Sequence, residues 1–351
     1  MDKWPKVAII ILNWNGWRDT IECLESLQRI TYPNYQVIVV DNGSTDNSVA
    51  RIKAWVQRNL PASFNVLKYN QNIKPLEWVE YTQVVAEDGG DPENETSLKT
   101  IQSSHCLVLI KLKENLGFSG GNNVGIRYSL EHGTDYLLLL NNDTVVNPGF
   151  LEPLVKAGEQ NPNLGIVVPK ILYYTEPSRI WAAGGYRSWV RGSGFAFGQN
   201  RVDCARYSQD RYVSFASGCA MLLKAEAIRR VGLFCEDYFL YLEDVDYCQR
   251  MQEKGFRIRY VGRSRVYHKV GSSTSQKDSL LYYQFRNRLF FMKRHAPREL
   301  YVLFLLYFTF TVAIKLLIWK VKGCKGKIRA TKAAISDFLH GQMGKATFEL
   351  S

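Results

Sequence analysis

Two apolar runs near the start of the chain, with a helical pattern between them, restrict its fold most strongly. Residues 7–12 are apolar and end at Asn13, and residues 36–41 are mostly apolar and end at Asp41. Runs of this length are typical of strands that are buried on both faces. The order strand, helix, strand predicts a parallel sheet with helical crossovers, in an α/β fold. Because such sheets bind ligands at the carboxyl ends of their strands, we expect Asn13 and Asp41 at a binding site.

The following residues continue this alternation of strand and helix patterns, with one interruption. Residues 70–105 break the pattern, because the stretch 87–95 is acidic and rich in turn formers. We expect a solvated insertion there. Elsewhere the pattern predicts strands at residues 64–69, 106–111, 136–140, 166–171 and 212–216, a helix at 47–59, and a hairpin or flexible loop at 184–198.

The net charge of +12 favours a polyanionic partner, such as nucleic acid, a phosphorylated ligand or an anionic membrane. Positive charge gathers between positions 315 and 332, where no acid intervenes. The preceding residues 300–319 are almost wholly apolar, apart from Lys315, and approach the roughly 20 residues that span a bilayer. They suit a helix that spans the membrane, enters it partly or lies in its interface, and the alternative is a helix packed in the core. Residues 325–341 predict a basic amphipathic helix.

The cysteines indicate a reducing environment. The chain has 7 cysteines, which are widely spaced and include no C-x-x-C pair. This pattern argues for reduced thiols in a cytosolic chain, and against a zinc site or a disulfide framework. Residues 1–6 contain an acid and a proline and do not resemble a signal peptide.

Three acids, Glu243, Asp244 and Asp246, open a predicted helix directly after the apolar run 238–242. Gly255 supplies a stop for that helix. A carboxylate at the mouth of an apolar pocket is suited to act as a general base. The alternative is helix capping, since acids are favoured at the positive end of a helix.

The turn after the second predicted strand, residues 41–46, offers contacts to a nucleotide. Asp41 can accept a hydrogen bond from the N3–H of a pyrimidine, while Ser44 and Asp46 can cap the next helix. The alternative is an ordinary turn between strand and helix, because these residue types are common in turns.

The glycine-rich stretch 115–125 opens another predicted helix. Glycine permits close backbone approach, and a helix start offers N–H donors to phosphate. Tight packing of helix against sheet explains the same residues equally well. No G-x-G-x-x-G fingerprint follows the first strand, which disfavours an NAD-dependent dehydrogenase.

Asp143 ends the strand predicted at 136–140 and is a candidate ligand for a divalent cation that bridges a diphosphate. Mg²⁺ usually takes one or two protein carboxylates, so one Asp can be enough. His268 follows another predicted strand and is a candidate metal ligand or diphosphate contact, although a lone His is more often structural. Arg286 and Arg288 are candidate phosphate contacts, and a solvated basic helix face is the alternative.

Taken in order, these motifs resemble the family 2 glycosyltransferases of GT-A fold. Within that family the chain is similar to the rhamnosyltransferase-like members that build bacterial and archaeal surface polysaccharides. The resemblance covers about residues 6–295, apart from the insertion. It implies a Rossmann-like, mostly parallel sheet flanked by helices, which we assign to residues 1–275. The helical, apolar and basic pattern that follows predicts a helical, membrane-associating region over residues 276–351. The motifs that carry it are residues 13–15, 41–46, 115–125, 140–143, 217–221 and 242–246.

The resemblance implies inverting transfer of a sugar, with rhamnose as one candidate, from a nucleotide-diphosphate donor to a saccharide or lipid-linked acceptor in cell-surface polysaccharide synthesis. It implies Mg²⁺ or Mn²⁺ as cofactor. Carried over to this sequence, Asp244 is the general base, supported by Glu243 and Asp246. Asp41 contacts the pyrimidine, and Asp143 and His268 are the candidate metal ligands. The other donor-binding candidates are Asn13, Ser44, Asp46, Asn115, Gly117, Gly120, Gly121, Asn122, Asn142 and Arg286.

We expect the enzyme on the cytoplasmic face of the cell membrane. Its expected partners are the donor, a saccharide or polyprenyl-linked acceptor and an anionic membrane surface. A second copy of the chain is a further option, and we expect no nucleic acid partner. The rival reading is a non-catalytic nucleotide-sugar-binding or scaffolding protein with the same fold. Asn141, where many relatives carry Asp, favours the rival, whereas Asp143, Glu243 and Asp244 argue against it.

Overall fold

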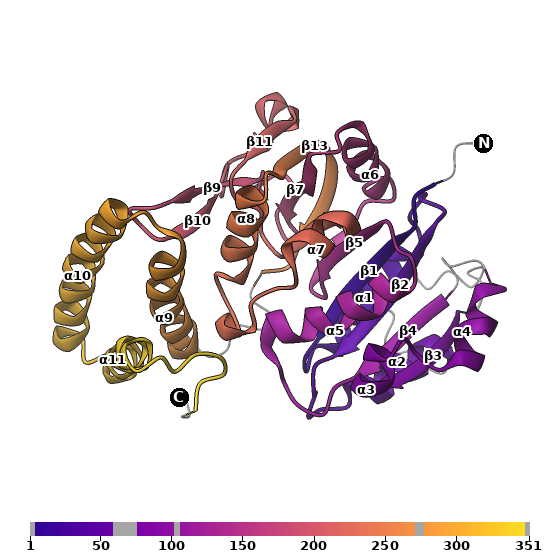
Figure 1. The fold of residues 1–351 in the computed structure, drawn as a ribbon, viewed down its shortest axis with the longest axis horizontal. Helices are drawn as coiled ribbons and strands as arrows, with labels where there is room; N and C mark the ends of the chain where they lie inside the picture. Colours follow the sequence, from indigo (N-terminus) through magenta and orange to yellow (C-terminus); the bar gives the residue numbers. More distant parts are fainter. Residues whose placement is uncertain (1–3, 59–75, 102–105, 271–276, 348–351) are drawn as a thin grey trace.

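The computed structural model describes residues 4–58, 76–101, 106–270 and 277–347 (Figure 1). Its centre is one mixed sheet, and a separate hairpin joins β9 (Gly185–Ser188) to β10 (Ser193–Ala196) within the predicted stretch 184–198. Along the sheet lie, in order, β11 (Arg211–Val213), β13 (Arg257–His268), β7 (Leu164–Tyr173), β12 (Ala220–Lys224), β5 (Tyr136–Asn141), β1 (Val7–Asn13), β2 (Tyr35–Asp41), β4 (Cys106–Lys111) and β3 (Glu77–Thr82), while β6 (Thr144–Val146) pairs with β13 and β8 (Ile180–Ala182) with β7.

The strands that carry the predicted site run in the same direction. β1 is parallel to both β2 and β5, and β4 is parallel to β2 and β3. In this register Asn13 lies opposite Asp41, and Asn141 lies opposite Leu12. The carboxyl ends of β1, β2 and β5 therefore meet at one edge of the sheet, as the sequence predicts. β12 is antiparallel to its neighbours β5 and β7, which makes the sheet mixed.

Helices cover both faces of the sheet, and β1 shows why its sequence is apolar throughout. Ile10 belongs to the core on the face that carries Val124, whereas Ile9 and Ile11 belong to the core on the face that carries Leu24. Both sides of the strand are thus removed from water. Among the described residues before 260, the helices are α1 (Trp17–Leu27), α2 (Ser48–Val56), α3 (Gln83–Glu87), α4 (Pro92–Lys99), α5 (Gly117–Glu131), α6 (Leu151–Gln160), α7 (Ala225–Val231) and α8 (Glu243–Glu253), together with the 3₁₀ helices η3 (Ala205–Ser208) and η4 (Glu236–Tyr238).

The prediction of a solvated insertion at 70–105 is wrong for residues 77–99, although much of their surface is exposed. β3 extends the sheet beside β4, and α3 and α4 follow it. Tyr81 anchors this part in the core, where its hydroxyl donates to Glu95 at 2.8 Å. The strand predicted at 64–69 lies outside the described residues.

Three helices end the chain: α9 (Lys277–His295), α10 (Arg298–Val321) and α11 (Lys325–Leu339). Figure 1 shows α9 between α10 and the body of the molecule. One stripe of α10, Phe304, Phe308 and Val312, is buried, and the rest of its apolar surface is largely exposed. α10 is the described helix that is long and apolar enough to cross a membrane, and only 17% of its most apolar window is buried. One face of α10 therefore packs on the core, and membrane association of its exposed face stays a prediction.

Candidate active site

Three donors hold the carboxylate of Asp41 at the ends of β1 and β2. Its Oδ1 accepts from Asn13 Nδ2 at 2.7 Å and from Ser44 Oγ at 2.6 Å, and its Oδ2 accepts from the Ser44 N–H at 3.1 Å. Asn13 and Asp41 are only 0% and 2% exposed, so these bonds are shielded from water. The structure thus brings together three of the residues predicted for the donor.

The turn that follows is shaped by Asn15, Gly43 and Asp46. Asn15 Oδ1 accepts from the backbone N–H groups of Thr45 and Asp46 at 2.8 and 3.2 Å. Gly43 has φ +68°, and a Cβ there would lie 2.4 Å from the carbonyl carbon of Glu114. Asp46 accepts from the Ser48 N–H at 2.8 Å at the start of α2. The alternative of an ordinary turn thus accounts for Asp46.

The glycine-rich start of α5 is a packing junction. Asn42 Oδ1 accepts from the Leu116 N–H at 2.9 Å, and Asn115 Oδ1 accepts from the Gly117 N–H at 2.8 Å. The next donor, the Phe118 N–H, bonds the carbonyl of Phe239 at 2.7 Å. These three N–H groups are therefore already engaged and do not form the phosphate cradle expected at this motif.

The glycines and Asn122 of the same motif have packing roles of their own. A Cβ on Gly121 would lie 2.4 Å from Leu12, and a Cβ on Gly120 would lie 2.7 Å from Leu116. The side chain of Asn122 donates to the Phe118 carbonyl one turn back at 2.8 Å. Close packing of helix on sheet, the alternative, thus explains Gly121, whereas the contacts of Gly120 and Asn122 lie within α5 and its N-cap.

Asp143 and His268 meet where β6 pairs with the end of β13. His268 Nε2 lies 3.2 Å from Asp143 Oδ1, and both side chains are largely buried. Burial alone would lower the pKa of His268, but the neighbouring Cys219 and Asp143 outweigh it and raise that pKa to about 10. The ring of Trp181 packs edge-on against the imidazole, with centroids 4.6 Å apart. The structure thus joins the two predicted metal-side residues.

Residues 217–219, just before β12, connect this pair to the predicted base. The carbonyl of Cys219 accepts from the Asn141 N–H at 2.9 Å, and the Gly218 N–H donates to Asp244 Oδ2 at 3.2 Å. Since Cys219 also neighbours His268, one short stretch contacts the turn of Asp143 and the carboxylate of Asp244. The resemblance includes this stretch but assigns no role to its backbone.

Thr20 links the two sides of the site, although the sequence gives no sign of it. Its hydroxyl donates to Asn13 Oδ1 at 2.7 Å and accepts from Asn142 Nδ2 at 3.1 Å. A chain of hydrogen bonds therefore runs from Asn142 through Thr20 and Asn13 to Asp41. The predicted donor residue Asn142 acts here by orienting the strand ends. A threonine within a helix is ordinary, so only the fold reveals its contact.

Glu243 and Asp244 differ in their acidity, which separates their roles. Burial raises the pKa of Glu243 well above its ordinary value, and the adjacent Asp244 raises it further. Burial raises the pKa of Asp244 to about 6, while backbone N–H groups of Gly218 and Val245 partly offset it. At neutral pH Asp244 is thus largely ionised, whereas burial and the adjacent Asp244 favour the protonated form of Glu243.

Two family models match the chain. Glycosyl transferase family 2 matches residues 8–75, and Glycosyl transferase family group 2 matches residues 136–321, which is more than half of the chain. The chain belongs to the family 2 glycosyltransferases.

Known members of the family are similar at low identity. The low-salt glycan biosynthesis hexosyltransferase Agl10 of Haloferax volcanii is 26% identical over 202 residues, which cover 56% of this chain and 64% of that protein. The N-acetylglucosaminyl-diphospho-decaprenol L-rhamnosyltransferase of Mycobacterium tuberculosis is 29% identical over 40% of this chain and 49% of that protein. Rhamnosyltransferase WbbL of Escherichia coli is 26% identical over 43% and 60%, respectively. The matches thus span between about half and two thirds of these relatives' own lengths.

Solved structures confirm the GT-A fold. Mannosyltransferase PcManGT from Pyrobaculum calidifontis, in complex with GDP-Man and Mn²⁺, has a TM-score of 0.51 and 13% identity over 97% of this chain and 89% of that chain. GalNAc-T7 with UDP, GalNAc and Mn²⁺ has a TM-score of 0.50 and 12% identity over 82% and 48%, respectively. At these identities the likeness concerns the fold.

In this glycosyltransferase, the Asp143–His268 pair fits a cation that is shared with a substrate. Within the described ranges, no three His, Cys, Asp or Glu side chains gather as a metal set. The Asp143 carboxylate alone leaves most coordination positions open, as Mg²⁺ sites with substrate phosphates do. The buried His268–Asp143 contact would hold the Asp143 side chain toward such an ion.

The capping alternative accounts for part of the pattern, because Asp244 accepts from the first-turn N–H of Val245 and all three acids lie in the first turn of α8. The N-cap residue is Leu242, which has a left-handed conformation and no side-chain capping bond. Asp244 instead bonds outward to Gly218 and to the next N–H, that of Val245, at 2.8 Å.

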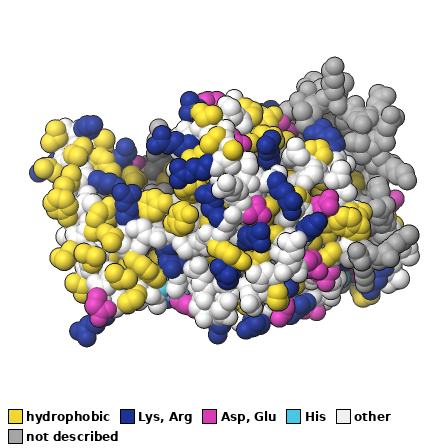
Figure 2. Space-filling view, turned by 90° about the horizontal axis from the view of Figure 1, so that it is seen from above, with side chains coloured by type: hydrophobic (Ala, Val, Ile, Leu, Met, Phe, Trp, Pro, Cys, Tyr) yellow, Lys and Arg dark blue, Asp and Glu magenta, His cyan; other side chains and the backbone are white. Residues whose placement is uncertain are grey.

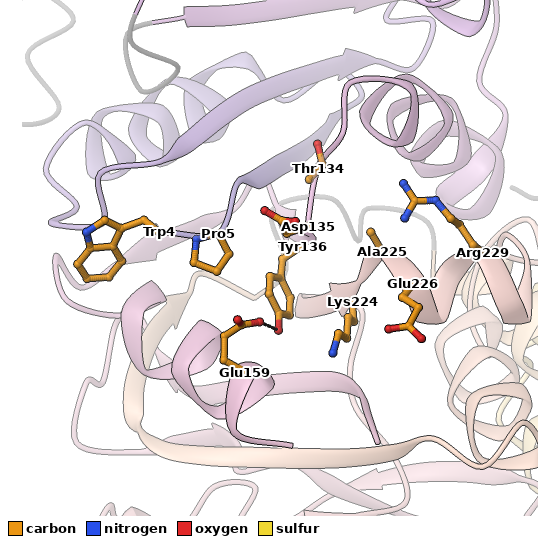
Figure 3. A pocket seen from close by; sticks show the side chains of 10 residues that line it. All are labelled: Trp4, Pro5, Thr134, Asp135, Tyr136, Glu159, Lys224, Ala225, Glu226 and Arg229. Atoms are coloured by element: carbon orange, nitrogen blue, oxygen red, sulfur yellow. Dashed lines mark hydrogen bonds between the residues drawn. The ribbon is translucent and has the colours of Figure 1, made fainter. Parts of the chain in front are cut away.

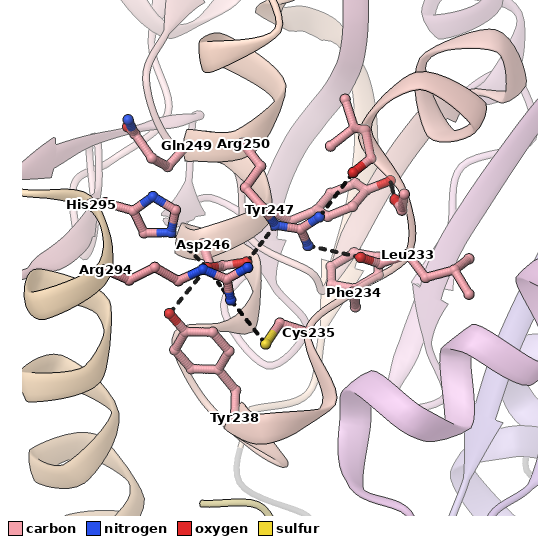
Figure 4. Close-up of polar contacts among 12 residues, drawn as sticks. Leu233, Phe234, Cys235, Tyr238, Asp246, Tyr247, Gln249, Arg250, Arg294 and His295 are labelled. Atoms are coloured by element: carbon pink, nitrogen blue, oxygen red, sulfur yellow. Dashed lines mark hydrogen bonds and ion pairs between the residues drawn. The ribbon is translucent and has the colours of Figure 1, made fainter. Parts of the chain in front are cut away.

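Asp246, predicted to support the base, has a different role. It is fully buried and bonds Arg250 Nε at 2.7 Å, His295 Nε2 at 2.8 Å and the Tyr238 hydroxyl at 3.1 Å (Figure 4). Burial on its own would raise the pKa of Asp246, but the bonds from His295 and Arg250 outweigh it and hold the pKa below the ordinary value. This network fastens α8 to the end of α9.

The structure places Arg286 in the interior. It is 0% exposed and contacts the carbonyls of Asp237 and Tyr238 at 3.4 Å and the hydroxyl of Tyr282 at 3.1 Å. Arg288 donates to the carbonyl of Arg191 and lies over the rings of α10. The alternative of a solvated basic face is wrong for Arg286. Its contacts hold η4, and the diphosphate contact stays a prediction.

A cavity of about 390 Å³ lies away from all of these residues (Figure 3). Tyr136 and Asp135, at the amino end of β5, line it, so it opens at the opposite end of the strands from Asn141. Its charges are mixed, and the Tyr136 hydroxyl is satisfied by Glu159 at 2.5 Å. The other lining residues are Trp4, Pro5, Thr134, Lys224, Ala225, Glu226 and Arg229.

Proposed function

We propose that this chain transfers a sugar, with inversion at the anomeric carbon, from a nucleotide-diphosphate donor to a saccharide or lipid-linked acceptor in cell-surface polysaccharide synthesis. The observation that carries the proposal is the position of Asp244. This acid has a pKa of about 6 and bonds the backbone stretch that contacts the Asp143 turn. A base at neutral pH thus lies beside the residues suited to the diphosphate.

In the proposed reaction, the acceptor hydroxyl gives its proton to the Asp244 carboxylate as its oxygen attacks the anomeric carbon. The new C–O bond forms while the bond between that carbon and the diphosphate oxygen breaks, and the nucleoside diphosphate leaves with the electron pair. A divalent cation near Asp143 would supply positive charge for the leaving diphosphate.

The names of the relatives support a hexose or deoxyhexose donor and a lipid-linked acceptor. A rhamnosyltransferase and a hexosyltransferase are among them, and one has a diphospho-decaprenol compound in its name. We extend these features to the present chain as part of the proposal, with rhamnose as the first sugar to test.

We further propose that α10 and α11 hold the enzyme on the cytoplasmic face of the membrane. Figure 2 shows hydrophobic side chains gathered at the end of the molecule that α10 forms, with Lys and Arg close by. Leu306 and Leu317 are 67% and 65% exposed there. Apolar burial combined with attraction of lysines to anionic headgroups is typical of interfacial helices. Because Phe304 and Phe308 pack toward α9, we propose that α10 lies in the interface.

A donor screen tests the proposed reaction. The purified full-length chain is incubated with nucleotide-diphosphate sugars, including dTDP-rhamnose, and a polyprenyl-diphosphate-linked saccharide, with and without Mn²⁺. We expect release of nucleoside diphosphate together with an extended acceptor. Donor binding without transfer to any acceptor would favour the non-catalytic alternative, for which Asn141 is the specific observation.

A further inference from the structure

The residues directly before the proposed base adopt an unusual backbone. Phe239, Tyr241 and Leu242 have φ values of 60°, 67° and 69°. Positive φ is uncommon for residues other than glycine, and strongly disfavoured for bulky ones. Such strain persists only where the surrounding structure enforces it, and it gathers at functional sites. This segment leads directly into Glu243 and Asp244.

The first of these residues forms the strained kind of γ-turn. Phe239 has ψ −59°, and the Leu240 N–H reaches the carbonyl of Tyr238 at 2.6 Å, two residues back. A γ-turn with positive φ is rare, because it crowds the side chain of its central residue against the backbone. The backbone from Tyr238 to Leu242 is thus not expected to hold its shape unaided.

One side chain bonds this turn at three points. Asn287 of α9 donates through Nδ2 to the carbonyls of Tyr238 and Leu240, each at 2.9 Å, and of Tyr241 at 2.8 Å. Asn287 is 0% exposed, so water does not compete for these bonds. These three carbonyl oxygens repel one another because they point toward the same place. The two N–H groups of the Asn287 amide, shared among them, offset that repulsion.

The other side of the turn rests on the glycine-rich start of α5. The Phe118 N–H bonds the carbonyl of Phe239 at 2.7 Å. A Cβ on Gly117 would lie 2.3 Å from that same carbonyl oxygen, so only glycine fits there. The turn is therefore held between α5 and α9, two elements far apart in the sequence.

We propose that Asn287 is a positioning residue, which holds the Tyr238–Leu242 turn and thereby sets where the carboxylates of Glu243 and Asp244 lie. This inference rests on the proposed function, because it assigns Asp244 as the base. Asn287 touches neither carboxylate in this structure and acts through the turn. The competing explanation is that Asn287 only docks α9 on the body of the protein.

The first test compares Asn287→Ala with Tyr283→Phe. Tyr283 lies one turn earlier on α9, and its ring, which stacks on Phe239, is kept in Tyr283→Phe. The hydroxyl that this variant removes accepts from the Ala346 N–H, which belongs to the C-terminal segment and not to the turn. We expect Asn287→Ala to lower kcat by about 10- to 100-fold, because small displacements of reacting groups have effects of this size. KM for the donor should change little, and Tyr283→Phe should retain wild-type kcat. Equal kcat in wild type and a folded Asn287→Ala variant would overturn the inference while leaving the proposed reaction intact.

Hydrogen exchange of peptides that cover residues 238–246 gives a readout that needs no substrate. In Asn287→Ala, exchange in these peptides should accelerate more than in α9 itself. Exchange that accelerates along α9 and not in the turn would support the docking explanation instead. If no sugar donor is turned over, the proposed function fails, but faster exchange in the turn would still show that Asn287 holds the turn.

A glycine in the turn supplies the decisive comparison. Tyr241→Gly removes the strain at one of the left-handed positions. The turn should then depend less on its hydrogen bonds to Asn287. We expect the loss of kcat caused by Asn287→Ala to be at least several-fold smaller in the Tyr241→Gly background than in the wild type. Equal losses in both backgrounds would show that Asn287 acts independently of the turn.

A second variant covers the case in which Asn287→Ala does not fold. Gly117→Ala presses a methyl group against the Phe239 carbonyl from the α5 side and leaves α9 untouched. It should reproduce the faster exchange at 238–246 and the loss of kcat. Unchanged exchange and kcat in Gly117→Ala would overturn the inference.

Discussion

The backbone N–H of Gly218 donates to Oδ2 of Asp244 over 3.2 Å. Through this bond the acid that opens α8 is tied to the start of β12, next to Cys219, whose carbonyl holds the Asn141 N–H. Elements that are distant in the sequence thus converge on a few atoms. The bond stabilises the ionised form of Asp244, while burial opposes it, and the balance leaves the pKa at about 6.

Asp244→Asn should lower turnover by about 10²–10⁴-fold, since it removes the general base. Folding should be retained, because the raised pKa means that the ionised carboxylate is unfavourable in the folded state, so a neutral amide loses no stability at pH 7.5. Steady-state transfer and urea unfolding provide the two measurements. Glu253→Gln, at the other end of α8, is the matched control and should retain turnover. Near-normal turnover of folded Asp244→Asn would exclude this residue as the base.

The pH profile should show the same group. Because the base must be ionised, kcat/KM should fall as the pH decreases through about 6, the pKa of Asp244. An ordinary aspartate would keep activity to a pH about two units lower. Rates measured between pH 4.5 and 8, with circular dichroism as a check on folding, test this. A flat profile down to pH 5 would contradict the assignment.

The strand ends of this site are predictable from sequence, because β1, β2 and β5 are buried on both faces and their apolar runs stop at the first polar residue. β3 escapes prediction, since this edge strand has neither a continuous apolar run nor a regular alternation, with Glu77 and Glu80 three positions apart. The separate roles of Asp244 and Asp246 also escape it. Only the fold shows that Asp246 faces Arg250 and His295 in the interior, whereas Asp244 faces Gly218.

Asp246→Ala should destabilise the protein strongly. It removes one member of a buried charged network and leaves Arg250 without its carboxylate, which costs about 3–5 kcal/mol in comparable cases. Glu176→Ala, which breaks the exposed pair with Arg179, should cost about 0–1 kcal/mol. Urea unfolding at pH 7 measures both. Because the pKa of Asp246 is lowered, its contribution is complete above its unfolded value and is lost as the pH falls through the folded value. A loss as small as that of Glu176→Ala would contradict the role of the network.

Mn²⁺ and a nucleoside diphosphate should bind cooperatively. Asp143 and His268 offer few ligands, so the cation alone should bind weakly, and the diphosphate would complete its coordination. Calorimetry with UDP, GDP and dTDP, each with and without Mn²⁺, should show tighter binding with the metal for the correct nucleotide. Asp143→Ala should abolish this gain, whereas Glu176→Ala, a change at an exposed acid that pairs with Arg179, should retain it. Metal-independent binding and transfer would indicate that side chains alone neutralise the diphosphate.

Leu306→Glu combined with Leu317→Glu should release the protein from membranes. Both leucines are highly exposed on α10, at 67% and 65%, so the charges should not unfold the protein but should oppose insertion of this face. Val202→Glu adds a charge at an apolar residue that is 60% exposed outside the C-terminal helices and should leave membrane binding unchanged. Co-sedimentation with vesicles of phosphatidylglycerol and phosphatidylcholine measures the effect.

Binding of the wild type should weaken with salt, because lysines near the surface contribute about 1 kcal/mol each through attraction to anionic headgroups. A wild-type protein that stays in the supernatant with anionic vesicles would show that this apolar face has another partner.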